Sequence, residues 1–213
     1  MDLQTLWSQW SDRQLEYITN IIKNSDAKTI CEIGVFGGSV ARPVWQSIKN
    51  TNKELYLVDN YHFLPANARK SFFKFVKKSI GDSEKIHTIL EDSHKYNWDQ
   101  HDFIIFSHGD YDHMVFDFNR LLQSNVKYAI IDLTPTCIDR FELLLSSVIT
   151  KESNLQLQYY IDGIFVLGRE ELKCTLPTKN KLFLHQQIKY APKKSGGYIE
   201  AIKTIKSRLG IKE

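Results

Sequence analysis

Five short apolar runs, separated by stretches with helical spacing, constrain the fold of this chain more than any other feature. The runs lie at 29–34, 54–59, 85–90, 102–107 and 127–133. Unbroken apolar runs of this length are typical of strands buried on both faces of a sheet. Helices are predicted between them, at 40–49, 66–79, 115–122 and 138–150. This alternation predicts a parallel sheet with helices on both faces.

The segments flanking this alternation follow other patterns. Residues 155–169, "LQLQYYIDGIFVLGR", hold two strand-like runs joined by Asp162-Gly163, a turn signal of antiparallel hairpins. Ser11 and Gln14 have the spacing of a capping box and predict a helix near the start. A last amphipathic helix is predicted near the end of the chain, from Ile202, Ile205 and Leu209. The predicted fold is therefore α/β and Rossmann-like: a mostly parallel seven-stranded sheet with helices on both faces and a terminal antiparallel hairpin.

Composition narrows the classes of function. The net charge of +3, from 28 basic and 25 acidic residues, is too small to indicate nucleic acid or an anionic membrane by itself. The basic residues of the last predicted helix fit a solvated face better than a nucleic-acid contact. No apolar stretch of about 18 residues is present, and the first residues lack the basic segment and apolar run of a secretory leader. We therefore expect a cytoplasmic protein with no membrane contact.

Cysteine usage agrees with this compartment. Cys31, Cys137 and Cys174 are odd in number and far apart, which matches neither a disulfide framework nor a zinc-binding pattern. Reduced, structural cysteines are the expectation.

A glycine-rich turn follows the first predicted strand and offers a binding site. Gly34, Gly37 and Gly38 precede a helix that starts near Ser39. Such a turn exposes backbone amides at the positive end of a helix and accepts an anion or a nucleoside-bearing ligand. The alternative is an ordinary tight turn between a strand and a helix.

Acidic residues close the next two predicted strands. Asp59 follows Gly38 by 21 residues, near the spacing at which an acid meets ribose hydroxyls in nucleotide-binding units. Asp92 and Ser93 follow the third strand. Ligands of open α/β sheets bind at this carboxyl edge, so the predicted ligand would meet all three strand ends.

Glu32 and the glycine spacing discriminate among nucleotide ligands. A dinucleotide-binding turn reads G-x-G-x-x-G, whereas this chain has a single Gly34 followed by Gly37-Gly38. A carboxylate would repel a pyrophosphate but pair with an ammonium group. "EIGVFGGS", followed by "LYLVDNY" and "EDSH", resembles the cofactor-binding motifs of class I S-adenosylmethionine-dependent methyltransferases, and is most similar to the macrocin and mycinamicin type of small-molecule O-methyltransferases.

The resemblance covers roughly residues 28–167 and implies roles for individual residues. The chain would form one methyltransferase-like domain, with a helical extension at 1–27, a cofactor-binding core at 28–168 and a C-terminal extension at 169–213. The methionine part of the cofactor would bind to Glu32, Gly34, Gly37, Gly38 and Ser39. The ribose would bind to Asp59, and the adenine would lie by Asp92 and Ser93. Three more residues could border the pocket, with core packing as the alternative for the last: Asn60, Tyr61 and Trp98.

A second polar cluster follows the fourth predicted strand, in "FSHGDYDHMVFDF" at 106–118. It holds His108, Asp110, Asp112 and His113. Methylation of a hydroxyl requires removal of its proton, which a histidine or a metal-bound alkoxide can provide. His113, His108 and Asp110 are therefore the catalytic candidates, while Asp112 fits a helix-opening role.

The resembling enzymes hold magnesium with acids at the fourth and fifth strand ends, which here implies Asp110 and Asp132. The match is imperfect, because His108 stands in place of the first acid and Leu133 in place of a paired acid. A metal-free base, His113 or His108, is the alternative.

The favoured hypothesis is S-adenosylmethionine-dependent methyl transfer to a hydroxyl of a small sugar-like or polyhydroxylated acceptor, with Mg²⁺ as an optional second cofactor. Two alternatives stay open: an NAD-dependent oxidoreductase, for which Asp59 is equally suited, and a non-catalytic cofactor-binding module. We expect a small-molecule partner and no nucleic acid. Homo-oligomerisation stays open, because Trp7, Trp10 and Trp45 suit either a lid over the acceptor or a dimer contact.

Overall fold

The computed structural model describes residues 10–107, 111–132, 154–161 and 164–172. Its elements, in chain order, are α1 (Asp12–Asn24), β1 (Thr29–Ile33), α2 (Ala41–Ile48), β2 (Glu54–Val58), α3 (Ala66–Ile80), β3 (Ile86–Ile89), the 3₁₀ turn η2 (Trp98–Gln100), β4 (Phe103–Phe106), α4 (Tyr111–Gln123), β5 (Tyr128–Asp132), β6 (Gln156–Ile161) and β7 (Ile164–Gly168).

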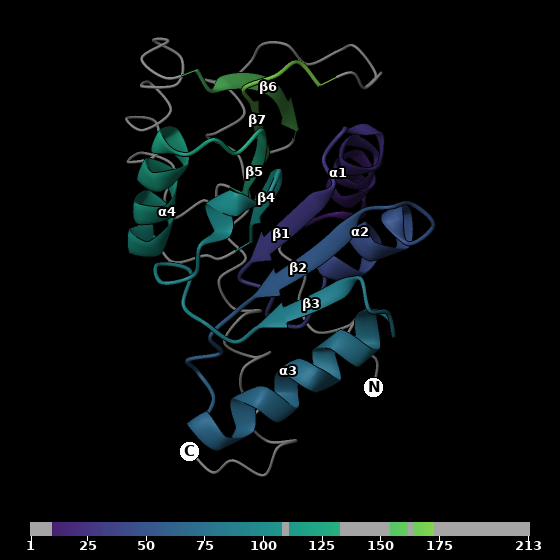
Figure 1. The fold of residues 1–213 in the computed structure, drawn as a ribbon, viewed down its shortest axis with the longest axis vertical. Coiled ribbons are helices and arrows are strands. Elements are labelled where there is room, and N and C mark those ends of the chain that lie inside the picture. The colour runs from purple at the N-terminus through teal and green to yellow at the C-terminus, as the bar shows by residue number, and fades with distance from the viewer. Residues whose placement is uncertain (1–9, 108–110, 133–153, 162–163, 173–213) are drawn as a thin grey trace.

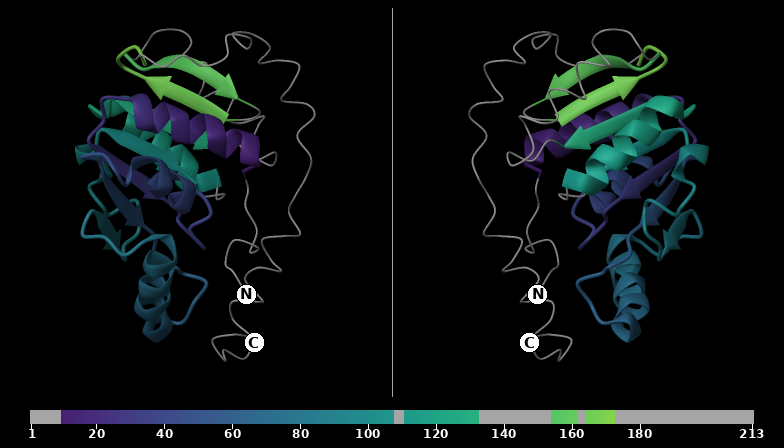
Figure 2. Two further views of the ribbon diagram at one scale, coloured as in Figure 1. Left: turned by 90° about the vertical axis from the view of Figure 1, so that its right-hand side faces the viewer. Right: turned by 90° about the vertical axis from the view of Figure 1, so that its left-hand side faces the viewer.

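The strands form one seven-stranded sheet in the order β3-β2-β1-β4-β5-β7-β6. The first five strands are parallel, while β7 is antiparallel to both β5 and β6 (Figures 1 and 2). The predicted fold class is therefore confirmed, including the antiparallel hairpin at one edge. Its turn residues, Asp162-Gly163, lie outside the described residues.

The carboxyl ends of four strands are level with one another. Ile33 of β1 lies opposite Val58 in β2 and Phe106 in β4, and Val58 lies opposite Ile89 in β3. The segments that follow these four residues therefore meet along one edge of the sheet, where ligands of such sheets bind. All of the predicted cofactor residues except Glu32 come from these segments.

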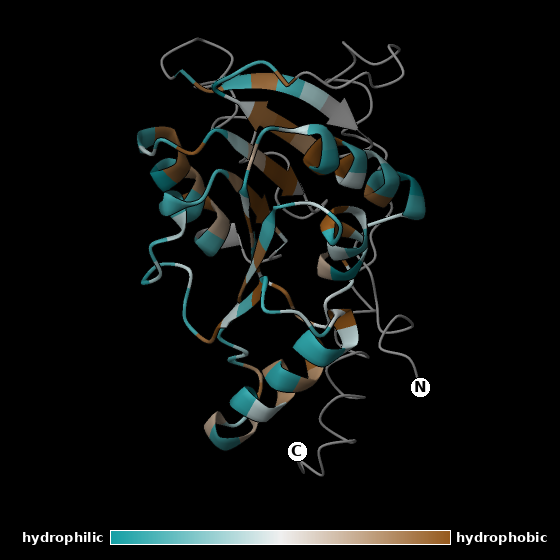
Figure 3. Ribbon diagram, turned by 45° about the vertical axis from the view of Figure 1, so that its right-hand side comes forward, coloured by the Kyte–Doolittle hydropathy of each residue, from teal (hydrophilic) through white to brown (hydrophobic). Residues whose placement is uncertain are grey.

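Alternating strand residues build a separate hydrophobic core on each face. Ile30, Leu55 and Ile105 pack on one face with α1, α2 and α3. Cys31 and Ile104 pack on the other face with α4. Figure 1 shows α4 on the opposite side of the sheet from α1 and α2, and Figure 3 shows the apolar strands between helices whose outer sides are polar. Side chains alternate along a strand, so burial on both faces explains the unbroken apolar runs.

Helix α1 confirms the predicted capping box. The Gln14 N–H donates to Ser11 Oγ at 3.2 Å, and the Ser11 N–H donates to Gln14 Oε1 at 2.6 Å. The box fixes the start of the helix, whose buried Ile18 and Ile22 join the first core.

Helix α4 begins four residues earlier than the apolar spacing predicts, at Tyr111 instead of Val115. The apolar stripe starts later because the first turn is polar, and a polar first turn is common in helices. His113 therefore lies in the first turn of a helix. The predicted helices at 138–150 and near the C-terminus lie outside the described residues. No helix in the described ranges has the length and apolarity needed to cross a membrane.

Candidate functional site

The turn between β1 and α2 has an unusual backbone. Gly34, Phe36 and Gly38 all have positive φ angles, of 83°, 47° and 78°. Residues with a Cβ atom are strained at positive φ, which explains why two of these three positions hold glycine. This conformation follows from the glycine spacing "GVFGG" and bends the chain sharply over the end of β1.

The two adjacent glycines of this turn have different surroundings. A Cβ atom at Gly38 would lie 3.0 Å from Ile80 Cδ1 and 3.3 Å from Val76 Cγ1 on α3. A Cβ atom at Gly37 would have nothing within 4 Å. Gly38 is therefore needed for packing and backbone conformation, whereas Gly37 borders open space.

Glu32 lies beneath this turn, near the end of β1. Its side chain is 1% exposed, and its Oε2 atom has no hydrogen-bond partner among the described residues. Burial raises the pKa of Glu32 well above its usual value; the Ser107 hydroxyl opposes this shift, and the nearby Asp59 carboxylate adds to it. A buried carboxyl group with an unpaired oxygen destabilises the ligand-free fold and can pair with a cationic ligand.

Asp59 follows β2 and supports the glycine turn. Its Oδ2 atom accepts the Phe36 N–H at 2.9 Å, and its Oδ1 atom accepts the Tyr61 N–H at 2.7 Å. A carboxylate offers about four lone-pair sites, which is more than these two bonds use. Asp59 therefore has a structural role that its spacing from Gly38 did not predict.

Tyr61 belongs to the core and not to a pocket wall. Its ring is fully buried among phenylalanines of α3, with centroid distances of 5.2 Å to Phe72 and 5.0 Å to Phe73. Its hydroxyl donates to the Phe36 carbonyl at 3.1 Å, which is a second support for the glycine turn.

The ends of β2 and β3 are linked by polar contacts. Asn60 Nδ2 donates to Asp92 Oδ2 at 3.1 Å, and the His94 N–H donates to Asp92 Oδ1 at 3.0 Å. Partial burial raises the pKa of Asp92, but the His94 N–H, the Asn60 amide and the His94 and His113 imidazoles outweigh it, so the pKa lies below its usual value. Asp92 is therefore a charged, half-buried carboxylate.

Arg120 of α4 holds the loop that follows β3. It stacks on the Trp98 ring, with its guanidinium carbon 4.5 Å from the ring centroid. Its nitrogens also donate to four oxygens of this loop, at distances of 2.7–3.4 Å: the carbonyls of Ser93 and Tyr96 and the side chains of Asn97 and Asp99. Trp98 is fully buried in the second core, in agreement with the core-packing alternative.

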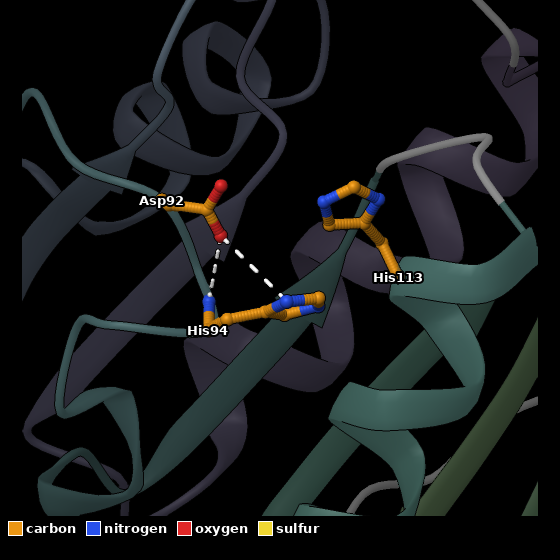
Figure 4. A group of neighbouring side chains, drawn as sticks. All are labelled: Asp92, His94 and His113. Atoms are coloured by element: carbon orange, nitrogen blue, oxygen red, sulfur yellow. Dashed lines mark hydrogen bonds and ion pairs between the residues drawn. The ribbon is translucent and has the colours of Figure 1, made fainter.

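The contacts that Arg120 makes with this loop, which we call the Arg120 clamp, place His94, which follows β3, next to His113 of α4. Their rings stack with centroids 4.5 Å apart, and Asp92 lies beside them (Figure 4). One ligand atom from each of Asp92, His94 and His113 lies within 4.8 Å of the other two. The sequence shows these residues in two separate motifs and gives no sign that they meet.

The structure describes some, but not all, of the remaining predicted site residues. Ser39 lies half-buried before α2, and Ser93 is buried next to Asp92. Asp132 ends β5, but its side chain is not described. His108 and Asp110 lie outside the described residues.

Comparison with known proteins extends these observations at the level of fold. No protein-family model matches the chain, and the curated proteins contain no significant sequence match. Solved structures do match. The SAH-bound methyltransferase PaMTH1 of Podospora anserina is 15% identical, with a TM-score of 0.53 over 76% of this chain and 80% of that one.

Two further solved structures are similar. The O-methyltransferase from Bacillus cereus in complex with SAH is 12% identical, with a TM-score of 0.54 over 76% of this chain and 84% of that one. Cofactor-bound Rv0187 from MTB is 12% identical, with a TM-score of 0.55 over 80% of this chain and 86% of that one. Some matched chains are longer, and this chain spans 52% of one of them. The chain thus has the Rossmann-like methyltransferase fold.

Proposed function

We propose that this protein binds S-adenosylmethionine and transfers its methyl group to an oxygen of a small, sugar-like or polyhydroxylated acceptor. The shared fold supports the proposal, because solved structures with this fold are described as a SAH-bound methyltransferase and an O-methyltransferase in complex with SAH. The site residues supply the more specific support.

The observation that carries the proposal is the buried, unpaired carboxyl group of Glu32 under the glycine turn. The cofactor's methionine part has an ammonium group, which would pair with Oε2 and remove the cost of leaving it unpaired. The open space beside Gly37 gives the ligand room to approach the backbone. The residues present therefore fit this cofactor. A pyrophosphate at the same place would be repelled, which argues against NAD.

The other strand ends suit the rest of the cofactor. We assign Asp59 to the ribose hydroxyls, because its carboxylate can accept them while holding the Phe36 and Tyr61 N–H groups. We assign Asp92, Asn60 and Ser93 to the adenine end. The bond between Asn60 and Asp92 would keep these two side chains in place before the ligand arrives.

When bound, the cofactor supplies a methyl group on a positively charged sulfur. The acceptor hydroxyl must lose its proton as its oxygen attacks the methyl carbon and the carbon–sulfur bond breaks. We propose that His113 or His108 takes this proton, with Asp110 orienting the histidine. A magnesium ion on Asp110 and Asp132 is the second hypothesis for this step.

Titration calorimetry of the full chain tests the cofactor assignment. S-adenosylmethionine and S-adenosylhomocysteine should bind saturably, whereas methylthioadenosine, which lacks the amino-acid part, should bind more weakly by about 1–3 kcal/mol, the usual cost of losing a buried charged partner. NAD should not bind. Binding of NAD instead of the adenosyl compounds would overturn the proposal in favour of an oxidoreductase.

An acceptor screen tests the reaction itself. Small polyhydroxylated compounds, with and without added Mg²⁺, should give SAH as a product. Cofactor binding without methylation of any acceptor would favour the non-catalytic module.

A further inference from the structure

The contact between His94 and His113 is not explained by the proposed cofactor site. The His94 ring is flanked by two aromatic rings: His113, with centroids 4.5 Å apart, and Phe116, with centroids 4.0 Å apart. Both neighbours belong to α4, whereas His94 belongs to the loop after β3. The imidazole therefore sits at the junction of two elements, half-buried and beside a charged carboxylate.

The ring nitrogens of His94 lack the partners that a buried imidazole normally has. Nε2 is shielded from solvent and makes no hydrogen bond within the described part of the chain. Nδ1 lies 4.0 Å from Asp92 Oδ1, which is an ion-pair distance but too long for a hydrogen bond. Buried polar atoms are almost always hydrogen-bonded, so an exception of this kind needs an explanation, and an ion bound at the site is one.

We propose that Asp92, His94 and His113 bind a divalent transition-metal ion such as Zn²⁺. One ligand atom from each of the three already lies within 4.8 Å of the others. Two imidazoles and one carboxylate are a ligand set of metal sites in which the protein supplies three ligands and a further position stays open. Mg²⁺ prefers oxygen ligands and near-octahedral geometry, so this site should discriminate against it.

The site needs a small, local movement to bind the ion. In a tetrahedral site with metal–ligand distances of about 2.0–2.1 Å, the ligand atoms lie about 3.4 Å from one another. In this structure the three ligand atoms lie up to 4.8 Å from one another. Rotation of the two rings about their Cβ–Cγ bonds would unstack them and turn one nitrogen of each toward Asp92. Figure 4 shows Asp92 and His94 next to each other, with His113 facing them from α4.

The two elements that carry the ligands are already fixed to each other. Arg120, two turns after His113 on α4, donates to the Ser93 carbonyl at 3.4 Å and the Tyr96 carbonyl at 2.7 Å. Ser93 lies between Asp92 and His94 in the chain. A metal ion would therefore bind to a framework that is held in place, which reduces the entropy lost on binding.

The site has a consequence for the cofactor, and this part of the inference rests on the proposed function. Asp92 would serve both the metal ion and the adenine end of S-adenosylmethionine. Each ligand should then weaken the binding of the other by the same factor, because coupling between two sites is reciprocal. Zn²⁺ would also occupy His113, a candidate base.

Calorimetric titration of the untagged, chelator-treated full chain with Zn²⁺ at about pH 7 tests the site. One ion should bind per chain, and Mg²⁺ should not compete with it. His94→Ala and His113→Ala should each lower the Zn²⁺ affinity more than about tenfold, since each removes one of three ligands. His87→Gln is the matched control: its ring is also half-exposed, at 39%, but lies on β3 away from the cluster.

The outcomes separate the two proposals. If the chain does not bind Zn²⁺, or if His94→Ala and His113→Ala bind it like the parent, the metal site is wrong. Thermal unfolding of each variant checks that the loss of affinity is not a loss of fold. If Zn²⁺ binds at the cluster and SAH does not bind at all, the metal site stands and the proposed function fails. If both bind without weakening each other, the shared use of Asp92 is wrong.

Discussion

Among single residues, Glu32 is the one on which the proposed function depends most, through its carboxyl group. It is buried, and its raised pKa means that the ligand-free protein holds a proton there more tightly than the unfolded chain does. The contribution of this group to the free energy of unfolding is greatest below the ordinary carboxyl pKa, about 4.3. It falls as pH rises toward the pKa that the group has in the folded protein. A functional group of this kind is retained at a cost to the fold.

Glu32→Gln should therefore stabilise the ligand-free protein and weaken cofactor binding. Glutamine has nearly the same shape but no charge to desolvate, so the free energy of unfolding at about pH 7.5 should rise by about 1–3 kcal/mol. The gain should shrink near pH 4.5, where the parent is protonated. Urea unfolding at the two pH values measures the stability, and SAH titration measures the affinity. A variant that is less stable and binds SAH normally would contradict the role given to Glu32.

At the scale of elements, two glycines of the turn between β1 and α2 have different roles. Gly38 has a φ of 78° and faces α3, whereas the Cβ direction of Gly37 is open. The same substitution at the two positions should therefore affect different properties.

Gly38→Ala should lower the free energy of unfolding by about 1–3 kcal/mol, because the methyl group adds backbone strain and crowds Ile80. Gly37→Ala should leave stability within about 0.5 kcal/mol, yet weaken SAH binding, because its methyl group enters the space assigned to the ligand. Parallel thermal unfolding and calorimetry of both variants measure the two effects. Equal effects of the two variants on stability and on affinity would refute this division of roles.

The contact between α4 and the loop after β3 is a second element-scale feature, with Arg120 at its centre. Arg120 donates to four loop oxygens and stacks on Trp98. Arg120→Lys keeps the charge but loses the planar fork that reaches several acceptors at once.

We therefore expect Arg120→Lys to reduce the free energy of unfolding by about 1–3 kcal/mol. It should also reduce Zn²⁺ affinity although it removes no metal ligand. Lys127→Arg, at an exposed ion pair with Asp26 on the surface, is the control and should change neither quantity. Urea unfolding and Zn²⁺ titration provide the readouts. Unchanged Zn²⁺ affinity in a destabilised Arg120→Lys variant would show that the clamp does not organise the cluster.

At the scale of the whole molecule, the sequence predicts the fold well because the strands β1, β4 and β7 are buried along nearly their whole length, and so on both faces. The apolar runs that this requires are visible without any long-range information, and the Asp162-Gly163 signal identifies the antiparallel hairpin. The start of α4 is predicted less well, because its polar first turn lacks the apolar spacing of the rest of the helix.

The candidate site is predictable only where it depends on local patterns. Glu32, Gly38 and Asp59 follow from a motif and a spacing. The cluster of His94 with His113 does not, because the two lie 19 positions apart in the sequence and only the packing of α4 against the loop after β3 brings them together. The sequence does not predict the structural role of Asp59 for the same reason: its partner Phe36 follows a different strand, β1.

The most direct test of the central claim, that Glu32 receives a cationic cofactor, is proton release on binding. Burial raises the pKa of Glu32, and pairing with an ammonium group should lower it again, so that binding releases protons in the pH range between the two pKa values. The heat of SAH binding should then differ between two buffers with different ionisation enthalpies, and the affinity should rise with pH. Glu32→Gln should abolish the difference. Equal heats for the parent protein in both buffers would contradict the account.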